Sequence, residues 1–71
     1  MTNYSLENEI QTLRKEMGMT QEELAKALGL SRQSIISMEK GDCSPSLCHA
    51  MRIAKHFDKA VEDIFTLIEK K

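Results

Sequence analysis

The chain has 71 residues, a formal net charge of −1 at pH 7, 41% hydrophobic residues and 30% charged residues. This length suffices for one small domain over residues 1–71, which would bury only about 60% of the surface that its unfolded chain exposes. Two cysteines are too few for a disulfide scaffold, and no signal peptide or long apolar run is visible, so we expect a cytoplasmic protein with no membrane segment. Apolar residues recur every three or four positions, which predicts an all-α fold of five helices.

The first helix is expected to run from Ser5 or Leu6 to Met17, after an extended or loose lead-in over residues 1–4. Gly18 should end it, because glycine readily adopts the left-handed conformation of a helix terminus. Apolar residues three or four positions apart are expected to form its inner face: Leu6, Ile10, Leu13 and Met17.

A second helix is predicted over residues 20–28, with strong signals at both ends. Thr20 is a good N-cap, and Glu23 three residues later completes a capping box. Gly29 lies directly after the last periodic apolar residue, where a left-handed helix ending is expected. The apolar residues at helical spacing are Leu24, Ala25 and Leu28.

A third helix is predicted over residues 32–40, with Ser31 as its N-cap and Gly41 as its stop. On a helical wheel, Ile35 and Met38 point toward a core. The opposite face holds Gln33 and Lys40, flanked by Ile36 and Ser37, with Arg32 on its rim. Glutamine can bridge N6 and N7 of adenine, arginine can bridge O6 and N7 of guanine, and isoleucine can touch a thymine methyl group. This face is therefore suited to reading DNA bases.

The stretch from Thr20 to Asp42 contains an ordered set of residues: Thr20-Gln21, Glu23-Leu24-Ala25, Gly29, Ser31, Ser34-Ile35, and Glu39 before Gly41. With this set, the stretch resembles the helix-turn-helix of the phage Cro/repressor-type, or xenobiotic-response-element-type, family of DNA-binding regulators. The resemblance continues through PSLCHAMRIAKHF and VEDIF, and so covers residues 10–65. It implies a repressor-like domain that binds double-stranded DNA, with residues 20–40 as the helix-turn-helix.

The resemblance also implies roles for individual residues. Arg14 should pair with Glu39, orienting one helix on another, and Gln21 should bind a phosphate and brace Gln33. Base contacts are expected from Arg32, Gln33, Ile36 and Ser37. Backbone contacts are expected from Thr20, Gln21, Ser31, Ser34, Lys40 and Ser44. The plainer alternatives are a solvated Gln21 and a Ser44 that serves only the turn.

Charge is unevenly distributed along the chain. Residues 32–59 carry five basic and three acidic side chains, whereas residues 1–31 and residues 60–71 are each net negative. Few phosphates can therefore be neutralised by lysine or arginine, and non-specific affinity for DNA should be weak. Backbone amides at helix starts would carry more of the phosphate contact.

A fourth helix is predicted from Pro45 or Ser46 to about Phe57, with Arg52 and Lys55 outside. Its inward residues should be Leu47, Ala50, Ile53, Ala54 and Phe57.

Residues 61–65 should form a short fifth helix, after which Thr66, Leu67 and Ile68 follow. This is more apolar surface than one short helix can hide, and an exposed apolar strip marks an interface. We expect a homodimer on an inverted-repeat operator, with recognition helices about 34 Å apart. The expected dimer contacts are Val61, Ile64, Phe65, Leu67 and Ile68, with Tyr4 and a short C-terminal strand as possible additions. The alternative is a tail folded back on its own core.

No enzyme, metal site, cofactor or small-molecule ligand is expected. Cys43, Cys48, His49 and His56 lack the spacing of a zinc site, and we expect one loop thiol and one half-buried thiol, Cys48. Glu22 and Glu23 are helix-start carboxylates and not a catalytic pair. Two other hypotheses remain open: an antitoxin or co-regulator that mainly binds a protein partner, and a thiol switch on DNA binding.

Overall fold

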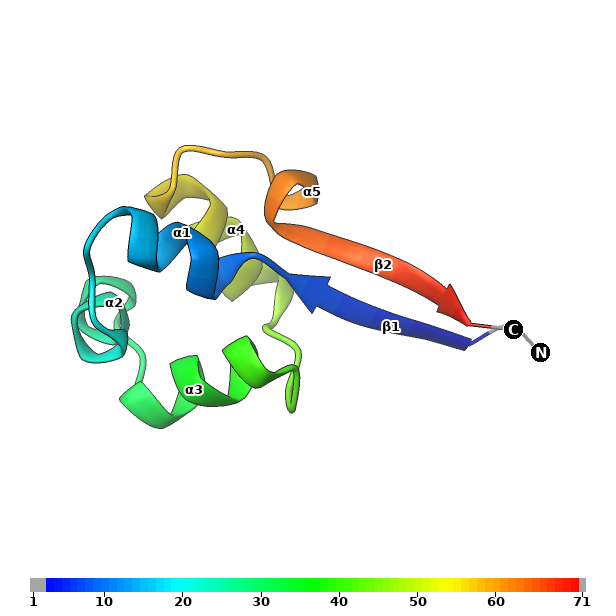
Figure 1. Cartoon of the computed structure of the whole chain (residues 1–71), viewed down its shortest axis with the longest axis horizontal. Coiled ribbons are helices and arrows are strands. Elements are labelled where there is room, and N and C mark those ends of the chain that lie inside the picture. Colours follow the sequence, from blue (N-terminus) through cyan, green and yellow to red (C-terminus); the bar gives the residue numbers. More distant parts are fainter. Residues whose placement is uncertain (1–2, 71) are drawn as a thin grey trace.

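The computed structural model describes residues 3–70, and it combines five helices with a two-stranded ribbon (Figure 1). Met1, Thr2 and Lys71 lie outside the described residues, and with them half of the expected N-terminal lead-in. In chain order the elements are β1 (Asn3–Asn8), α1 (Ile10–Glu16), α2 (Gln21–Leu28), α3 (Arg32–Lys40), α4 (Leu47–His56), α5 (Val61–Ile64) and β2 (Phe65–Lys70). The helices form a rounded body, and the ribbon projects from one side of it (Figure 1).

The ribbon corrects the all-α prediction. β1 and β2 pair antiparallel, with Asn3 opposite Lys70 at the outer end and Asn8 opposite Phe65 at the body. The C-terminal strand was foreseen as a possibility, but its partner was not. The two strands come from opposite ends of the chain. The short alternation of polar and apolar residues over residues 3–8 therefore does not indicate which segment this strand pairs with.

The predicted start of the first helix is wrong for the same reason. Asn3 and Tyr4 are extended in β1, which agrees with one of the two forms expected for the lead-in, but α1 begins only at Ile10. Leu6 reaches the core from the strand and not from a helix. Met17 is 53% exposed, because α1 ends at Glu16 and Met17 lies at the turn that follows.

The two helices of the central motif begin and end as their local signals predict. The Thr20 hydroxyl accepts from the Glu23 backbone N–H at 3.1 Å, and the Glu23 carboxylate accepts from the Thr20 N–H at 2.9 Å. This backbone hydrogen bond from Thr20, aided by its hydroxyl, holds the pKa of Glu23 below its usual value. Ser31 caps α3 by accepting from the Ser34 N–H at 3.1 Å. Gly29 ends α2 with φ of +70°.

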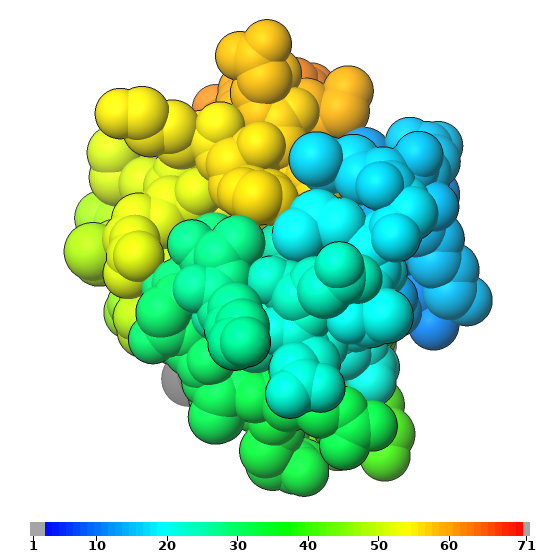
Figure 2. Space-filling view, turned by 90° about the vertical axis from the view of Figure 1, so that its left-hand side faces the viewer, coloured from blue at the N-terminus to red at the C-terminus, as the bar shows by residue number. Residues whose placement is uncertain are grey.

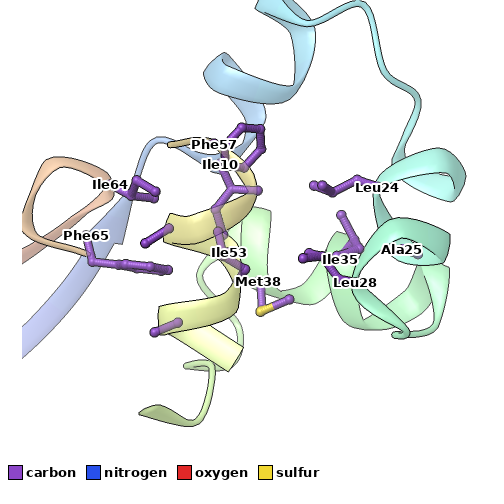
Figure 3. Packing of buried hydrophobic residues seen from close by; sticks show 12 residues of the cluster. Ile10, Leu24, Ala25, Leu28, Ile35, Met38, Ile53, Phe57, Ile64 and Phe65 are labelled. Carbon is purple, nitrogen blue, oxygen red and sulfur yellow. The ribbon is translucent and has the colours of Figure 1, made fainter. Parts of the chain in front are cut away.

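One hydrophobic core joins all five helices (Figure 3). Its fully buried large side chains come from α1, α2, α3, α4 and α5, and they are Ile10, Leu24, Ile35, Ile53 and Ile64 respectively. Phe65 of β2 is buried in the same core, so the base of the ribbon is anchored in the body. Partly buried residues packed around the core include Leu6, Leu13, Met19, Leu30 and Val61.

α4 differs from its prediction at its first residue. Ser46 caps the helix as expected, by accepting from the His49 N–H at 3.1 Å. Leu47, however, is 74% exposed and does not point inward. Leu47 and Met51 lie four residues apart on a stripe along the outer side of α4, beside the buried face of Ala50 and Ile53.

Among the described helices, none is long and apolar enough to cross a membrane.

The left-handed turn at Gly29 gives a testable prediction. A Cβ added there would lie 3.7 Å from Nη2 of Arg52, an ordinary contact, so space is not limiting. The left-handed backbone conformation is what limits substitution at this position. Gly29→Ala should therefore lower the free energy of unfolding by about 1–2 kcal/mol in urea titrations. Gly29→Asn should cost less, because asparagine tolerates this conformation. Equal stability of all three proteins would contradict the prediction.

Candidate nucleic-acid interface

The α3 helix lies at the surface with one face buried and the other outward. Ile35 and Met38 fill the core beneath it, with 0% and 3% of their surface exposed. Figure 2 shows the side of the body that faces away from the ribbon, where the α2 and α3 segments lie together in cyan and green. The helix-turn-helix thus forms a continuous surface that the ribbon does not cover.

The four candidate base readers lie on or beside the outward face of α3. Arg32 and Gln33 are exposed, and Ile36 and Ser37 are partly exposed. The Gln33 Nε2 and the Ser37 Oγ are 3.5 Å apart, so these two polar groups are neighbours one helical turn apart. The face combines hydrogen-bond donors, acceptors and one apolar side chain, which is what base edges in a major groove require.

The six candidate backbone contacts fall at helix ends and in a loop. Thr20 and Ser31 are N-caps of α2 and α3, and both are exposed. The hydroxyls of Ser31 and Ser34 are 2.9 Å apart and form a hydrogen-bonded pair at the start of α3. Lys40 and Ser44 are exposed at and beyond the C-terminal end of α3. Helix starts of this kind present free backbone N–H groups to an anion.

A buried polar network fixes α3 on α1. Nε of Arg14 donates to Oε2 of Glu39 at 2.7 Å, and Nη2 donates to Oε1 at 3.2 Å. The two side chains are only 8% and 4% exposed. The third guanidinium nitrogen, Nη1, donates to the Met19 carbonyl at 2.8 Å. This bidentate pair therefore holds α3 against α1 and the turn before α2.

Gln21 belongs to this network, which corrects its expected contact with Gln33. Its Nε2 donates to Oε1 of Glu39 at 3.1 Å. The buried carboxylate needs several donors, and Gln21 supplies one that the guanidinium does not. Gln33 instead points along α3 toward Ser37.

Asn8 is a further polar residue that holds α3 in place within the chain, and the sequence analysis did not identify it. Its Nδ2 donates to the Met38 carbonyl at 2.9 Å, and its Oδ1 accepts from the Ile10 N–H at 3.1 Å. An asparagine two residues before an apolar helical run is a local signal for such a helix-start contact. Its contact with α3 has no local signal, because 30 residues separate the partners.

The expected dimer contacts divide into two groups. Ile64 and Phe65 are 0% and 7% exposed in the core of their own chain, so they cannot form an interface, and this part of the prediction is wrong. They are buried because α5 packs its single turn against the body and β2 leaves from it. Leu67 is 63% exposed, Ile68 is partly buried, and Val61 packs at the margin of the core.

Both thiols are exposed, which corrects the expectation of a half-buried Cys48. Cys48 lies on the outer side of α4, where no other described element covers it. Within residues 3–70, no three histidine, cysteine or acidic side chains are close enough to share a metal ion.

Comparison with known proteins identifies the family. The sequence model of the helix-turn-helix family matches residues 10–64, which is most of the chain. The chain belongs to the Cro/repressor-type, or xenobiotic-response-element-type, helix-turn-helix family. The matched region begins at α1 and ends with α5, so it contains the whole helical body but neither strand of the ribbon.

Several relatives carry the name of helix-turn-helix-type transcriptional regulator. One from Methanothermobacter thermautotrophicus is 56% identical over 79% of this chain and 83% of its own length. One from Methanocaldococcus jannaschii is 50% identical, over 84% and 91%. One from Bacillus subtilis is 40% identical, over 92% and 98%. The chain is thus a DNA-binding helix-turn-helix transcriptional regulator.

A crystal structure of a Bacteroides fragilis protein has the same fold. It aligns with a TM-score of 0.76 over 86% of this chain and 98% of that one, at 21% identity. At this identity the likeness concerns the fold alone.

The buried pair predicts a large and specific loss of stability. Arg14→Met leaves the Glu39 carboxylate buried without its counter-ion, and should lower the free energy of unfolding by about 3–5 kcal/mol. The double variant Arg14→Met, Glu39→Met removes both charges and should recover part of this loss. Lys15→Met, one position away on the exposed side of α1, should change stability by less than about 0.5 kcal/mol. Urea titrations measure all three, and a loss for Arg14→Met no larger than that for Lys15→Met would contradict the prediction.

Proposed function

We propose that this chain is a repressor that binds an inverted-repeat operator as a homodimer and blocks polymerase by occupying the site. The observation that carries the proposal is the free face of α3. It is held outward by buried Ile35 and Met38 and by the Arg14–Glu39 pair, and it carries side chains that can read base edges. α3 would then lie in the major groove.

In this proposal Arg32, Gln33, Ile36 and Ser37 contact bases. The capping hydroxyls and N–H groups at the starts of α2 and α3 contact phosphates, and Lys40 and Ser44 contact the backbone at the other end of α3. Gln21 would use the amide hydrogen that Glu39 does not take. Since the net charge is −1, these directed contacts must supply much of the affinity that a basic surface gives other DNA-binding proteins.

The ribbon supports the homodimer. Residues directly opposite each other in a ladder share a face, so Leu67 lies beside Leu6, and Tyr4 follows on the same face. This apolar stripe starts at the buried Phe65 and continues outward through Leu67, which is 63% exposed, to Tyr4, which is 58% exposed and lies opposite Glu69 at the polar outer end of the face. A two-stranded ribbon with an uncovered apolar face is only marginally stable in water.

A second copy would cover this face on both chains at once, because a two-fold interface is self-complementary. The dimer contact moves accordingly from Ile64 and Phe65 to the outer ribbon. Ile68 lies opposite Ser5 on the other face of the ribbon, where it would contribute less. A two-fold dimer with one α3 on each half matches an operator with two-fold symmetry.

Selection from random duplex DNA tests the operator proposal. The purified protein, at moderate salt, should enrich an inverted repeat whose half-site centres lie about 34 Å, or one helical turn, apart. Enrichment of a single unrepeated half-site would contradict the proposed dimer but would still agree with base reading by α3.

Gln33→Ala tests base reading by α3. It should weaken binding to the selected site by roughly 1–3 kcal/mol and relax the preference at one base pair of each half-site, because it removes a bidentate base contact. Gln11→Ala, which truncates an exposed glutamine on α1, is the matched control and should leave binding unchanged. A loss that is equal on all sequences would show that Gln33 does not read bases.

Leu67→Lys tests the dimer. Placing a charge on the apolar stripe should shift the protein toward monomer in sedimentation measurements and weaken binding to the two-half-site duplex. Thr66→Lys adds the same charge one position earlier, on the other face of the ribbon, and should retain the dimer. A wild-type protein that is monomeric both free and on the duplex would refute the dimer proposal.

A second candidate function is the binding of a protein partner, as in an antitoxin or co-regulator, and the outer side of α4 favours it. Leu47 and Met51 there are 74% and 58% exposed, and they line a groove with Cys48, Arg52 and Lys55. This apolar floor with two cations would fit an acidic amphipathic helix of another protein. If the selection enriches no DNA sequence, even at low salt, that outcome would favour this candidate over the operator proposal.

A further inference from the structure

We infer that Asn8 is a positioning residue for DNA recognition, which couples the ribbon to the recognition helix; the inference rests on the proposed homodimer. Asn8 is the last residue of β1 and lies opposite Phe65 in the ladder. Its side chain bonds to two other elements at once, the start of α1 at Ile10 and the end of α3 at Met38. One partly buried amide thus joins the ribbon, α1 and α3.

Only an asparagine-like side chain can make both contacts here. The Ile10 N–H needs an acceptor and the Met38 carbonyl needs a donor, and a carboxamide supplies one of each. The Met38 carbonyl also accepts from the Gly41 N–H at 3.1 Å, so both of its lone pairs are used. This carbonyl belongs to the C-terminal turn of α3, where partial negative charge favours a donor and disfavours a carboxylate.

The surroundings make this bond a direct polar link between β1 and α3, beside the core that both elements share. A hollow lies between β1 and the end of α3, lined by Leu6, Glu7 and Asn8 on one side and by Glu39, Lys40 and Gly41 on the other. The strand end is itself held, because the Glu9 N–H donates to the Ile64 carbonyl at 2.9 Å. The ribbon base is therefore fixed to the body. From this fixed strand end, the Asn8 side chain binds the C-terminal end of α3 at one side of the hollow.

Two successive residues of α3 are held from different sides. Arg14 of α1 binds the Glu39 side chain, and Asn8 of β1 binds the Met38 backbone. If the ribbons meet in the dimer, each ribbon–α3 joint sets the separation and tilt of the two recognition helices. A stiff joint makes affinity depend steeply on half-site spacing, because only one spacing meets both helices without deformation.

The test compares duplexes that carry the selected half-sites at their preferred spacing and with one base pair added or removed. Wild-type protein should prefer one spacing. Asn8→Asp keeps the acceptor for Ile10 but loses the donor to Met38, and should bind the preferred duplex about tenfold more weakly while the spacing preference flattens. Binding to a duplex with one half-site should change by less than about twofold, because α3 itself is intact.

Two further variants control for charge and folding. Asn3→Asp adds the same charge at the exposed outer end of β1 and should behave as wild type. Asn8→Ser keeps an oxygen for the Ile10 N–H but is too short to reach Met38, so it should repeat the flattened spacing preference without adding a charge. Urea titrations establish that each variant is folded at the assay temperature.

The outcomes separate this inference from the dimer on which it rests. A wild-type spacing preference that both Asn8 variants retain would overturn the inference and leave the dimer standing. An equal loss on one and two half-sites would also overturn it, because Asn8 would then act only through stability. A wild-type protein with no spacing preference would overturn the inference, because the joint would then be flexible, whereas a wild-type protein that binds the duplex as a monomer would refute the dimer and the inference with it.

Discussion

The bidentate ion pair between Arg14 and Glu39 is the interaction on which the position of α3 depends. Both side chains are almost fully buried, and such a pair contributes little net stability compared with an apolar pair of similar volume. Its effect is geometric: the planar guanidinium donates two hydrogen bonds to the carboxylate and so fixes their relative orientation, and a third donated to the Met19 carbonyl fixes the guanidinium in turn. The surface of α3 that faces solvent is therefore set by a contact on its hidden side.

Asn8 complements this pair from the ribbon side. Core packing by Ile35 and Met38 alone would let α3 slide or tilt, because apolar contacts are not directional. A carboxylate held by Arg14 and a backbone carbonyl held by Asn8 supply that direction at two neighbouring residues. We propose that this arrangement allows a nearly neutral domain to bind DNA, since two helices placed accurately in one dimer can replace the affinity that many basic side chains would give.

The sequence predicted the parts of the fold that depend on local signals. Thr20, Gly29 and Ser31 define α2 and α3 correctly, because caps act on their own neighbours. The ribbon was beyond such reasoning, because residues 3–8 gain strand structure only from a partner at the other end of the chain. The burial of Ile64 and the contact of Asn8 with α3 were missed for the same reason, because both depend on residues far away in the sequence. Within the site, the face of α3 was predictable from helical periodicity, whereas the bond of Gln21 to Glu39 was not, since it depends on where a buried carboxylate lies.

The most direct test of this account is a titration of isotopically labelled protein with its selected duplex, followed through backbone amide signals. The largest changes should fall along the outward face of α3 and at the N-terminal turns of α2 and α3, and the outer side of α4 should be unaffected. Changes concentrated on the stripe of Leu47 and Met51, with α3 silent, would contradict the claim that α3 reads DNA.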